Sequence, residues 1–549
     1  MTTTRRDRIK EPPKTLDELL DFFQHDYRIR SGITAWKELP AREAVTAPLP
    51  ADLDPRLARA LAERGITRLY SHQAEALGAV RRGESVTVVT PTASGKTLCF
   101  NLPVMERILR EPGTRALYLF PTKALAQDQM HELHELITAT GEDVKTFTYD
   151  GDTPDDARRA IRQMAHVVIT NPDMLHSGIL PHHTKWVRLF ENLRYVVVDE
   201  LHTYRGVFGS HVANVLRRLR RVARFYGADP QFICCSATIA NPRELAEGLT
   251  GTAMTLIDQS GAPQGAKTVI FYNPPVRNRE LGIRESYRKA TERFGERFLE
   301  NGISTIVFAM SRLNVEILTK YLQEKVRRLG KRVEGYRGGY LPNVRREIER
   351  GLREGKIDGV VSTNALELGV DIGSLDACVI AGYPGTIAST WQQAGRAGRR
   401  RGRSVVVLVA RSMPLDQYVV EHPEYFFEAT PEQGLINPDN LLILVSHLKC
   451  AAFELPFEEG EPFGDVPAEA VADALGFLED HRVVHAAPNG LGKKVWHWST
   501  DAYPANHVSL RSVGWDNFVV IDLETDHTIA EMDWRSTHTM LHEQAIYQH

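Results

Sequence analysis

An eight-residue stretch from Thr90 to Thr97 carries the residue types that bind phosphate groups. It reads Thr-Pro-Thr-Ala-Ser-Gly-Lys-Thr and stands between an apolar run and a helical pattern. In such a loop, backbone N–H groups surround the phosphates, while a lysine and a hydroxyl hold the terminal phosphates and Mg²⁺. We therefore expect a Walker A loop in which Thr90 replaces the first glycine, Lys96 contacts the β- and γ-phosphates and Thr97 binds Mg²⁺. The flanking patterns disfavour the alternative, a chance Gly-Lys-Thr turn.

Two adjacent carboxylates follow another apolar run. Val196 to Val198 lead directly into Asp199 and Glu200. At the end of a strand, such a pair can hold Mg²⁺ and polarise the water that attacks the γ-phosphate. A helix cap is the alternative for a lone acidic pair. Because the phosphate loop lies upstream in the same chain, we assign Mg²⁺ binding to Asp199 and activation of water to Glu200.

A pair of arginines lies in the second half of the chain. Arg396 and Arg399 are three residues apart, so we expect them to share one face of a helix. Two guanidiniums on one face suit the γ-phosphate of a nucleotide held by the first half, which is the role of an arginine finger. A solvated basic turn is the alternative, and the two motifs upstream favour the finger.

The elements that must position these residues follow a repeating pattern. Short apolar runs alternate with helical patterns on both sides of a linker-like stretch at residues 258–265. The expected strands are 86–90, 116–120, 146–149, 167–170, 195–198 and 232–236 before the linker, and 305–309, 332–336, 359–362, 377–381 and 404–409 after it. This alternation is typical of parallel, doubly wound sheets, so the sequence predicts an α/β fold with two such domains in tandem.

The two ends of the chain depart from this pattern. The beginning is punctuated by prolines and reads as an extension packed against the core. Beyond Pro431, two helical patterns precede short alternating segments, which predicts a winged-helix-like module. The predicted domains are an N-terminal extension (1–65), two α/β domains (66–260 and 266–430) and a C-terminal accessory domain (431–549).

Composition excludes several classes of protein. The 549 residues are 42% hydrophobic and 25% charged, as in globular proteins, and the net charge is −3. A strongly basic binder is excluded, although a local basic groove is not. No apolar run reaches the ~18 residues of a membrane span, and the first residues lack a secretory apolar region. We therefore expect a cytoplasmic protein without a membrane anchor.

The cysteines and the C-terminal histidines do not predict a metal site. None of the five cysteines forms a Cys-x-x-Cys motif, so we expect buried, reduced thiols. Cys234 and Cys235 are adjacent and should face opposite sides of a strand. His538 and His542 are four residues apart, but no third ligand is evident near them.

The motifs above occur with further blocks in a characteristic order. The additional blocks are Tyr70–Gln73, Pro121–Leu125, Thr170–Asp173, Ser236–Thr238, Val307–Arg312 and Ser362–Asp371. Over about residues 66–410 the chain resembles superfamily 2 helicases of the DEXH type. The resemblance implies two RecA-like domains that bind ATP and Mg²⁺, with Gln73 reading the adenine.

The resemblance also implies a set of site residues. Those expected around ATP are Gln73, Thr92, Ala93, Ser94, Gly95, Lys96, Thr97, Asp199, Gly369, Asp371, Gln392, Arg396 and Arg399. Among the catalytic residues we place Lys96, Glu200, Arg396 and Arg399. Polar residues where a loop enters a helix are expected to contact strand phosphates, namely Thr122, Lys123, Thr170, Ser311, Arg312, Thr363 and Asn364. Helix capping is a compatible alternative for these hydroxyls. Trp391 is expected either to stack on a base or to lie in the core.

Other segments resemble a narrower family. They are Asp199–His211, Tyr383–Ser389, Asn437–Asn440 and Tyr503–Arg511. They are similar to the bacterial mitomycin repair factor helicases, the mycobacterial SftH translocases and their fungal RecQ-four-like relatives. That family implies ATP-dependent 3′-to-5′ translocation on single-stranded DNA. It also implies a role in DNA repair, for example in the repair of interstrand crosslinks or related damage. Its members continue into a four-cysteine zinc domain, whereas this sequence stops at His549 with unclustered cysteines, so zinc is not predicted.

Two other functions stay open. An RNA helicase has a similar core, although a DEAD-type box would have Asp at the position of His202. An ATP-driven remodeller that binds duplex without separating strands is the second, and a winged helix permits duplex binding. The expected partner is single-stranded or tailed DNA, bound by a monomer. Arg217, Arg218, Arg220, Arg221 and Arg224 are interpreted first as a solvated helix face.

Overall fold

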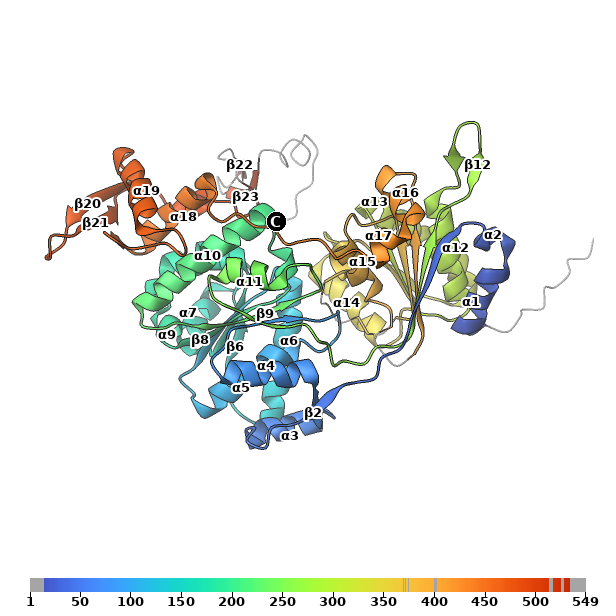
Figure 1. Cartoon of the computed structure of the whole chain (residues 1–549), viewed down its shortest axis with the longest axis horizontal. Coiled ribbons are helices and arrows are strands. Elements are labelled where there is room, and N and C mark those ends of the chain that lie inside the picture. The colour runs from blue at the N-terminus through green and yellow to red at the C-terminus, as the bar shows by residue number, and fades with distance from the viewer. Residues whose placement is uncertain are drawn as a thin grey trace, which may run out of the picture. The chain divides into compact units, whose positions relative to one another are not determined.

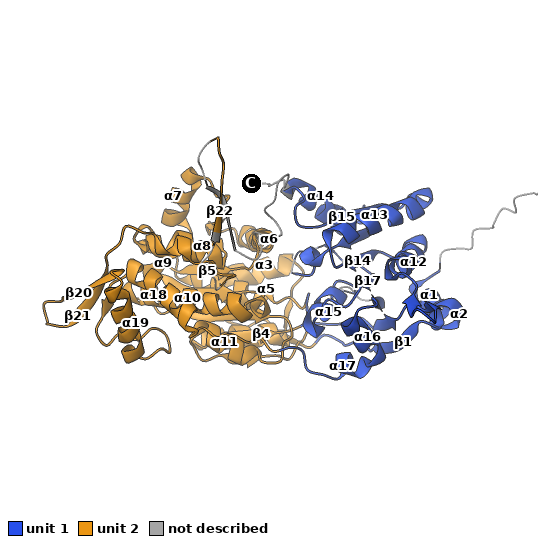
Figure 2. Cartoon of the chain, turned by 90° about the horizontal axis from the view of Figure 1, so that it is seen from above, with its two compact units in different colours: residues 1–44, 91–93, 262–432 blue, residues 45–90, 94–261, 433–549 orange. Residues whose placement is uncertain are grey.

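The computed structural model describes residues 14–368, 370, 372–373, 375–398, 402–512, 517–524 and 528–533. The chain divides into two compact units, which Figure 2 shows in different colours. Unit 1 comprises residues 1–44, 91–93 and 262–432, and unit 2 comprises residues 45–90, 94–261 and 433–549. Each unit is built around its own seven-stranded sheet.

The sheet of unit 2 is parallel throughout. Its strands, in spatial order, are β10 (Thr255–Ile257), β4 (Val86–Val89), β9 (Gln231–Ser236), β8 (Leu193–Val198), β5 (Arg115–Leu119), β7 (Val167–Thr170) and β6 (Thr146–Thr148). Because β8 and β4 both have β9 as a neighbour, the loops that follow β4 and β8 emerge at the same, carboxyl edge of the sheet. The phosphate loop and the acidic pair are therefore placed at one edge.

Side chains of these strands alternate between two cores, as a doubly wound sheet requires. One face is covered by α3 (Pro55–Glu63), α4 (Ser71–Arg81), α5 (Thr97–Arg110) and α6 (Lys123–Thr140). The other is covered by α7 (Asp155–Met164), α9 (Val187–Glu191), α10 (Gly206–Phe225) and α11 (Pro242–Thr250). Cys235 belongs to the first core and Cys234 to the second, which confirms their expected opposite directions.

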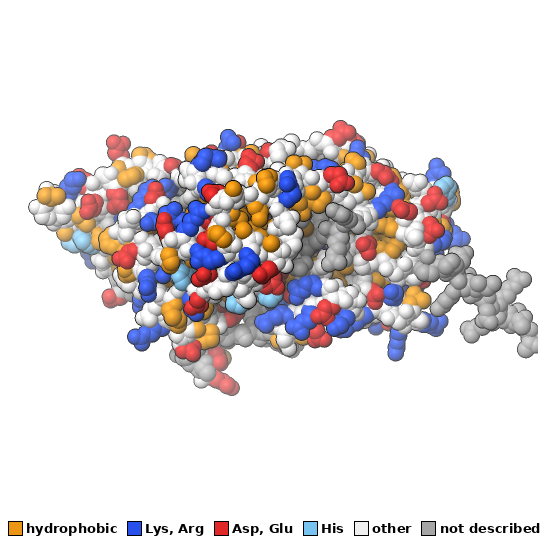
Figure 3. Space-filling model, turned by 90° about the horizontal axis from the view of Figure 1, so that it is seen from below, with side chains coloured by type: hydrophobic (Ala, Val, Ile, Leu, Met, Phe, Trp, Pro, Cys, Tyr) orange, Lys and Arg blue, Asp and Glu red, His pale blue; other side chains and the backbone are white. Residues whose placement is uncertain are grey.

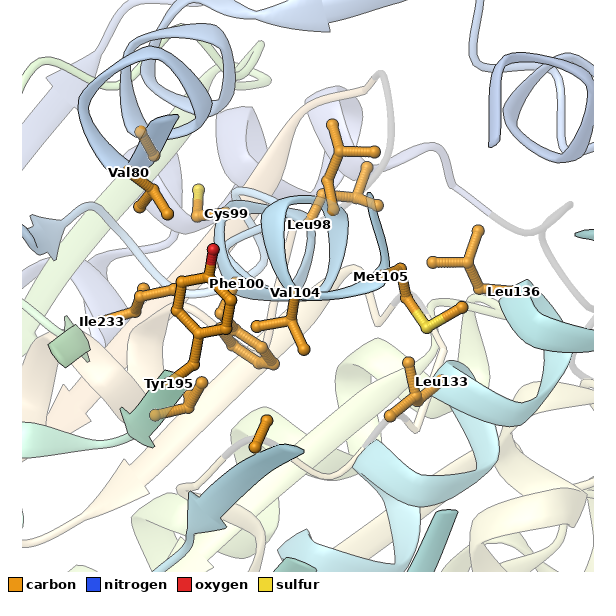
Figure 4. Close-up of a cluster of buried hydrophobic side chains, with 14 of the residues drawn as sticks. Val80, Leu98, Cys99, Phe100, Val104, Met105, Leu133, Leu136, Tyr195 and Ile233 are labelled. Atoms are coloured by element: carbon orange, nitrogen blue, oxygen red, sulfur yellow. The ribbon is translucent and has the colours of Figure 1, made fainter. Parts of the chain in front are cut away.

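Helix α5, which begins directly after the phosphate loop, is embedded in the first core. Figure 4 shows its residues Phe100, Val104 and Met105 against side chains of α6 and the sheet. Phe100 makes an edge-to-face contact with Tyr118 at 5.4 Å between ring centroids. This packing fixes the start of α5, and with it the direction in which the loop presents its N–H groups.

The sheet of unit 1 has one antiparallel edge strand. Its order is β1 (Ile33–Leu39), β11 (Lys267–Tyr272), β18 (Ser404–Val409), β17 (Ala377–Ala381), β14 (Thr305–Ala309), β16 (Gly359–Ser362) and β15 (Val333–Tyr336). Strand β1 pairs antiparallel with β11, and the remaining pairs are parallel. The expected extension of residues 1–65 is therefore divided, since β1 completes this sheet whereas β2 (Thr46–Pro48) and α3 lie in unit 2.

Helices cover both faces of this sheet as well. One face carries α1 (Leu16–His25), α12 (Tyr287–Glu300) and α13 (Arg312–Val326), and the other carries α14 (Pro342–Arg353), α15 (Ile387–Ala394), α16 (Pro414–Glu421) and α17 (Pro423–Phe427). A hairpin of β12 (Val276–Asn278) and β13 (Ile283–Arg284) projects from unit 1 (Figure 1). Short additional elements are α2 (Tyr27–Arg30), β3 (Arg68–Tyr70), α8 (Pro172–Met174), η1 (Leu175–Ile179), η2 (Leu180–Lys185), η3 (Leu201–Thr203), η4 (Arg327–Leu329) and η5 (Asn364–Leu366).

The C-terminal part of unit 2 is a separate small core. Helices α18 (Leu441–Glu454) and α19 (Ala468–Asp480) pack on a three-stranded antiparallel sheet of β19 (Phe457–Glu458), β21 (Lys494–Trp498) and β20 (Val484–Pro488). It is followed by η6 (Pro504–His507) and a hairpin of β22 (Asn517–Ile521) and β23 (Thr528–Asp533). Helices followed by a small sheet match the predicted winged-helix-like module.

The predicted α/β fold class is confirmed: each unit has its own sheet, parallel except for β1, and helices with a small antiparallel sheet follow at the C-terminal end. Among the described residues, no helix combines the length and apolarity needed to cross a membrane. All five cysteines are buried and free. His538 and His542 lie outside the described residues.

Candidate functional site

The phosphate loop leaves β4 at Thr90 and ends where α5 begins. Lys96 Nζ donates to the carbonyl oxygen of Thr90 at 2.7 Å, and the hydroxyls of Thr90 and Ser94 are 2.6 Å apart. Ala93 and Gly95 have φ values of 64° and 80°. Left-handed residues in a turn leave successive N–H groups pointing inward, which is the geometry of an anion-binding concavity. Thr92 is half-buried, and Thr97 is the first residue of α5.

Gln73 fixes the far side of this loop. Its Nε2 donates to the carbonyl oxygen of Gly95 at 2.9 Å, and its Oε1 accepts from the N–H of Tyr70 at 2.9 Å. A Cβ at position 95 would lie 2.7 Å from Gln73 Nε2. Position 95 therefore favours glycine for two reasons: its φ is positive, and Gln73 leaves no room for a Cβ. In this structure Gln73 also has a structural role, besides the adenine contact expected of it.

The acidic pair ends β8 in a buried position. Asp199 and Glu200 are 7% and 9% exposed. Burial, together with the neighbouring Glu200 carboxylate, raises the pKa of Asp199 to about 7. Glu200 has φ +51°, and its N–H donates to Asp199 Oδ1 at 2.8 Å. A non-glycine residue in this region costs free energy, and such strain is typical of functional sites.

His202 connects the acidic pair to a neighbouring strand. Its Nδ1 accepts from the N–H of Ala237 at 3.2 Å and lies 3.7 Å from Glu200 Oε2. Burial lowers the pKa of His202 to about 4, so the ring is neutral near pH 7. Because Nδ1 accepts a hydrogen bond, the proton resides on Nε2. The imidazole thus connects Ala237, the first residue after β9, to the loop that carries Glu200.

Several of the hydroxyls that are expected to contact DNA phosphates cap helices. Thr122, Ser311 and Thr363 accept from backbone N–H groups at the starts of α6, α13 and η5. Lys123 pairs with Asp152 at 2.7 Å. Arg312 and Asn364 are exposed. A capping hydroxyl keeps a second lone pair and its proton, so capping is compatible with the proposed DNA contacts of Thr122, Ser311 and Thr363.

Thr170 differs from that expectation. It is 1% exposed, and its hydroxyl donates to the carbonyl oxygen of Tyr149 at 2.6 Å. The hydroxyl therefore stabilises the end of β7, and it does not face solvent, where it could contact the phosphates of a nucleic acid. Asn171 caps α8 through a bond from the N–H of Met174 at 2.8 Å.

The expected helix face for the two arginines is wrong. Helix α15 ends at Ala394 with Gly395 as its cap, so Arg396 lies beyond it. The Arg396 guanidinium is fully buried and donates to the carbonyl oxygens of Glu367 at 2.7 and 3.2 Å and of Val370 at 2.8 Å. It thereby orders the segment that follows η5. Arg399, Gly369 and Asp371 lie outside the described residues.

Trp391 and Gln392 lie on α15. The Trp391 indole is half-buried and stacks on Phe426 with centroids 4.9 Å apart. Gln392 is 6% exposed. The start of α15 is held by Glu432, whose carboxylate accepts from the N–H groups of Ile387 at 2.5 Å and Ala388 at 3.1 Å. Sequence reasoning missed Glu432, because no local pattern connects it to a helix that begins 45 residues earlier.

The expected solvated face on α10 is wrong for four of its five arginines, since Arg224 is exposed but the other four are buried or half-buried. Arg218 is buried against Glu454, and Arg221 binds Glu461 at 2.6 Å and lies over the Phe457 ring. The other two pairs are Arg217–Asp439 at 2.7 Å and Arg220 with the carbonyl oxygens of Thr250 and Gly251. Arg217, Arg220 and Arg221 also line a cavity of about 970 Å³ between α10 and the winged-helix-like module. Arg217, Arg218 and Arg221 thereby join α10 to the winged-helix-like module, whereas Arg220 binds the end of α11. By contrast, basic and acidic side chains are interspersed on the face shown in Figure 3.

Three family models match successive parts of the chain. The DEAD/DEAH box helicase model matches residues 70–245, and the helicase conserved C-terminal domain matches residues 290–401. The winged helix domain of ATP-dependent helicase HRQ1 matches residues 436–513. The first contains the phosphate loop and the acidic pair, and the second contains Arg396.

The chain is similar over nearly its whole length to known helicases. It is 57% identical over 541 residues to the ATP-dependent helicase YprA of Bacillus subtilis, covering 98% of the chain and 71% of YprA. It is 37% identical over 556 residues to ATP-dependent helicase HRQ1 of Saccharomyces cerevisiae, covering 97% of the chain and 50% of HRQ1.

Crystal structures of the DUF1998 helicase MrfA show the same fold. The structure bound to DNA has a TM-score of 0.88 and 56% identity, and covers 98% of the chain and 71% of MrfA. A second structure, bound to DNA and AMPPNP, has a TM-score of 0.87 and covers 98% of the chain and 74% of MrfA.

Proposed function

Because the chain belongs to the DEAD/DEAH box helicases, and is thus an ATP-dependent helicase that hydrolyses ATP, we propose that it moves 3′ to 5′ along single-stranded DNA. We propose further that it separates tailed duplexes and acts in DNA repair, including that of interstrand crosslinks. The observation that supports DNA as the substrate is the crystallisation of MrfA, 56% identical to this chain, in complex with DNA. Polarity and the repair role follow from the resemblance to the mitomycin repair factor family.

The proposal assigns distinct tasks to residues at the edge of the unit 2 sheet. Lys96 is released from the Thr90 carbonyl and contacts the β- and γ-phosphates of ATP, among the loop's N–H groups. Glu200 accepts a proton from the attacking water. Arg396 and Arg399 remain proposed arginine fingers. For Arg396, this role requires that it exchange its bonds to the Glu367 and Val370 carbonyls for phosphate oxygens.

Thr97 and Asp199 suit Mg²⁺, which prefers oxygen ligands. The buried Asp199 carboxylate lies beside a second carboxylate, and its raised pKa reflects the cost of that negative charge. A divalent cation there would offset both burial and repulsion. When bound, Mg²⁺ would neutralise charge that develops on the phosphates. The residues present therefore fit the ion that the sequence predicts.

This assignment predicts a pH dependence of Mg²⁺ binding. A proton and Mg²⁺ compete for Asp199, whose pKa is raised to about 7. Above that pH the carboxylate is ionised and the affinity is constant, whereas below it the affinity should fall about tenfold per pH unit. Calorimetric titration of Mg²⁺ in the presence of AMPPNP, between about pH 8 and about pH 6, measures this. In Asp199→Asn the dependence should disappear, and an unchanged affinity in the parent protein would contradict the assignment.

Strand displacement tests the proposed function directly. Duplexes with a 3′ or a 5′ single-stranded tail, in matched DNA and RNA versions, are offered with ATP. We expect unwinding of the 3′-tailed DNA and stimulation of ATP hydrolysis by single-stranded DNA, both weakened by salt. Preferential unwinding of RNA would favour the RNA helicase, and DNA-stimulated hydrolysis without displacement on any substrate would favour the remodeller. Lys96→Ala serves as the inactive control.

A further inference from the structure

His72 lies between the phosphate loop and the point where the chain leaves unit 2. Its Nε2 is 3.1 Å from the carbonyl oxygen of Ser94 in the loop. Its Nδ1 is 3.2 Å from the backbone nitrogen of Gly261. The imidazole is fully buried. His72 is not among the residues expected to contact ATP, so its two contacts have no role in the nucleotide site as predicted.

The two contacts fix the protonation of the ring. The N–H of Gly261 can only donate, so Nδ1 must accept and carries no proton. The carbonyl of Ser94 can only accept, so Nε2 must carry the proton and donate. A neutral ring with this tautomer satisfies both partners, and burial lowers the pKa of His72 to about 4, which keeps it neutral. The ring therefore joins two backbone segments through its two nitrogens, which belong to one rigid group.

Gly261 is held tightly at this position. It is the last residue of unit 2 before the chain passes to unit 1. Its carbonyl accepts from the N–H of Val45, another residue at a unit boundary, at 2.9 Å. A Cβ on Gly261 would lie 2.4 Å from the Val45 carbonyl oxygen and 2.3 Å from Ser71 Oγ. The backbone can thus come this close to the start of α4 only because residue 261 is glycine.

We propose that His72 is a positioning residue that transmits the state of the phosphate loop to the connection between the units. The inference rests on the proposed function, in which ATP enters the loop and DNA stimulates its hydrolysis. A shift of the Ser94 carbonyl as the loop closes on phosphate displaces the imidazole, and the imidazole in turn displaces or releases Gly261. The side chain of the neighbouring Gln73 instead binds the backbone of Gly95 and Tyr70.

Two substitutions separate the two contacts. A glutamine amide reaches the position of Nε2, so His72→Gln keeps a donor to Ser94 and loses the acceptor for Gly261. An asparagine oxygen reaches the position of Nδ1, so His72→Asn keeps the acceptor for Gly261 and loses the donor to Ser94. We expect His72→Asn to raise the KM for ATP about tenfold, the effect of one hydrogen bond. We expect His72→Gln to change KM less than about twofold but to lower the DNA-stimulated kcat about tenfold.

Amide hydrogen exchange gives a second measurement on the same proteins. In the parent protein, AMPPNP should change the exchange rate of the Gly261 N–H, and in His72→Gln this response should be lost. His131→Asn, a substitution of an exposed histidine on α6, is the matched control and should behave as the parent. Equal shifts of KM and kcat in both His72 variants, with a lower melting temperature, would reduce His72 to a packing residue and overturn the proposal.

The parent protein alone also tests the inference, should both variants fail to fold. A Gly261 amide whose exchange is the same with and without AMPPNP overturns it. If single-stranded DNA does not stimulate ATP hydrolysis by the parent protein, the proposed function fails, whatever the variants do. If stimulation is normal and both variants match the parent in KM, kcat and exchange, only the role of His72 fails.

Discussion

Glu200→Gln should lower the kcat of DNA-stimulated ATP hydrolysis by about 10²- to 10⁴-fold, the range of a lost general base. Glutamine has nearly the same shape, but its amide cannot accept a proton from water near pH 7. Nucleotide binding should persist, because the loop N–H groups, Lys96 and Asp199 are untouched. The measurement is steady-state hydrolysis with saturating single-stranded DNA, beside a titration with a fluorescent ATP analogue.

The structure gives a reason for such a large effect at this position. Glu200 is held at φ +51°, and its N–H is bound to Asp199 Oδ1. His202 lies 3.7 Å from its carboxylate and is anchored on the Ala237 N–H. The position of the Glu200 side chain is therefore set by its backbone conformation, beside a buried imidazole. A side chain in a fixed, strained position loses its catalytic effect when its chemistry changes, even if its shape does not.

Two controls make this prediction specific. Glu135→Gln changes an exposed carboxylate on α6 that is 54% exposed, and should leave hydrolysis unchanged. A urea titration of Glu200→Gln should show a midpoint no lower than that of the parent, because the substitution removes a buried charge. Retention of more than about a tenth of the parental kcat would assign the general base to another group.

The sequence predicted the parts of the fold that depend on local pattern. The apolar runs at residues 167–170, 305–309, 359–362, 377–381 and 404–409 coincide with strands, because fully buried parallel strands are continuous apolar runs. The run of β1 (Ile33–Leu39) was missed, since it mixes exposed and half-buried residues as an antiparallel edge strand does. Its place in the sheet depends on β11, more than 200 residues away.

The sequence did not predict contacts between side chains that are far apart along the chain. The spacing of Arg396 and Arg399 predicted a shared helix face, but α15 ends at Ala394 with Gly395 as its cap, so Arg396 lies beyond the helix. Arg218 belongs to a run of five arginines that predicts a solvated face, because their pattern indicates charge and does not indicate a buried partner. Its partner, Glu454, is 236 residues further on. Pattern shows residue type and spacing, whereas burial of a charge depends on the fold.

Arg218→Ala should destabilise unit 2 by about 3–5 kcal/mol, the cost of leaving one member of a buried ion pair alone. The Arg218 and Glu454 side chains are 0% and 1% exposed. Arg218 Nε donates to both Glu454 oxygens at 3.1 Å, and Nη2 donates to Oε1 as well. Removal of the guanidinium leaves the Glu454 carboxylate in a dry interior, where an unpaired charge is strongly disfavoured.

The guanidinium also orders three buried histidines. Nη1 donates to Nδ1 of His176 at 2.6 Å and to Nδ1 of His447 at 3.3 Å. His447 Nε2 then donates to His211 Nδ1 at 3.0 Å, and His211 Nε2 donates to the Ser512 carbonyl at 3.0 Å. Burial lowers the pKa of each ring, so all three are neutral and each donates once and accepts at least once. Arg218 is the cation that starts this chain of bonds, and its loss removes the donor for two rings.

A double-mutant cycle distinguishes a pair from two independent losses. Arg218→Met and Glu454→Leu should each destabilise the protein strongly, whereas the double variant should recover most of the loss, because no charge is left buried. Urea unfolding followed by far-UV circular dichroism measures this, with Arg224→Ala on the same helix as the control. Arg224 and Asp229 form an exposed pair at 3.9 Å, worth less than about 1 kcal/mol. Additive effects in the double variant would mean that the two charges do not stabilise each other, and that the winged helix is held against α10 by its apolar contacts and by Arg221 instead.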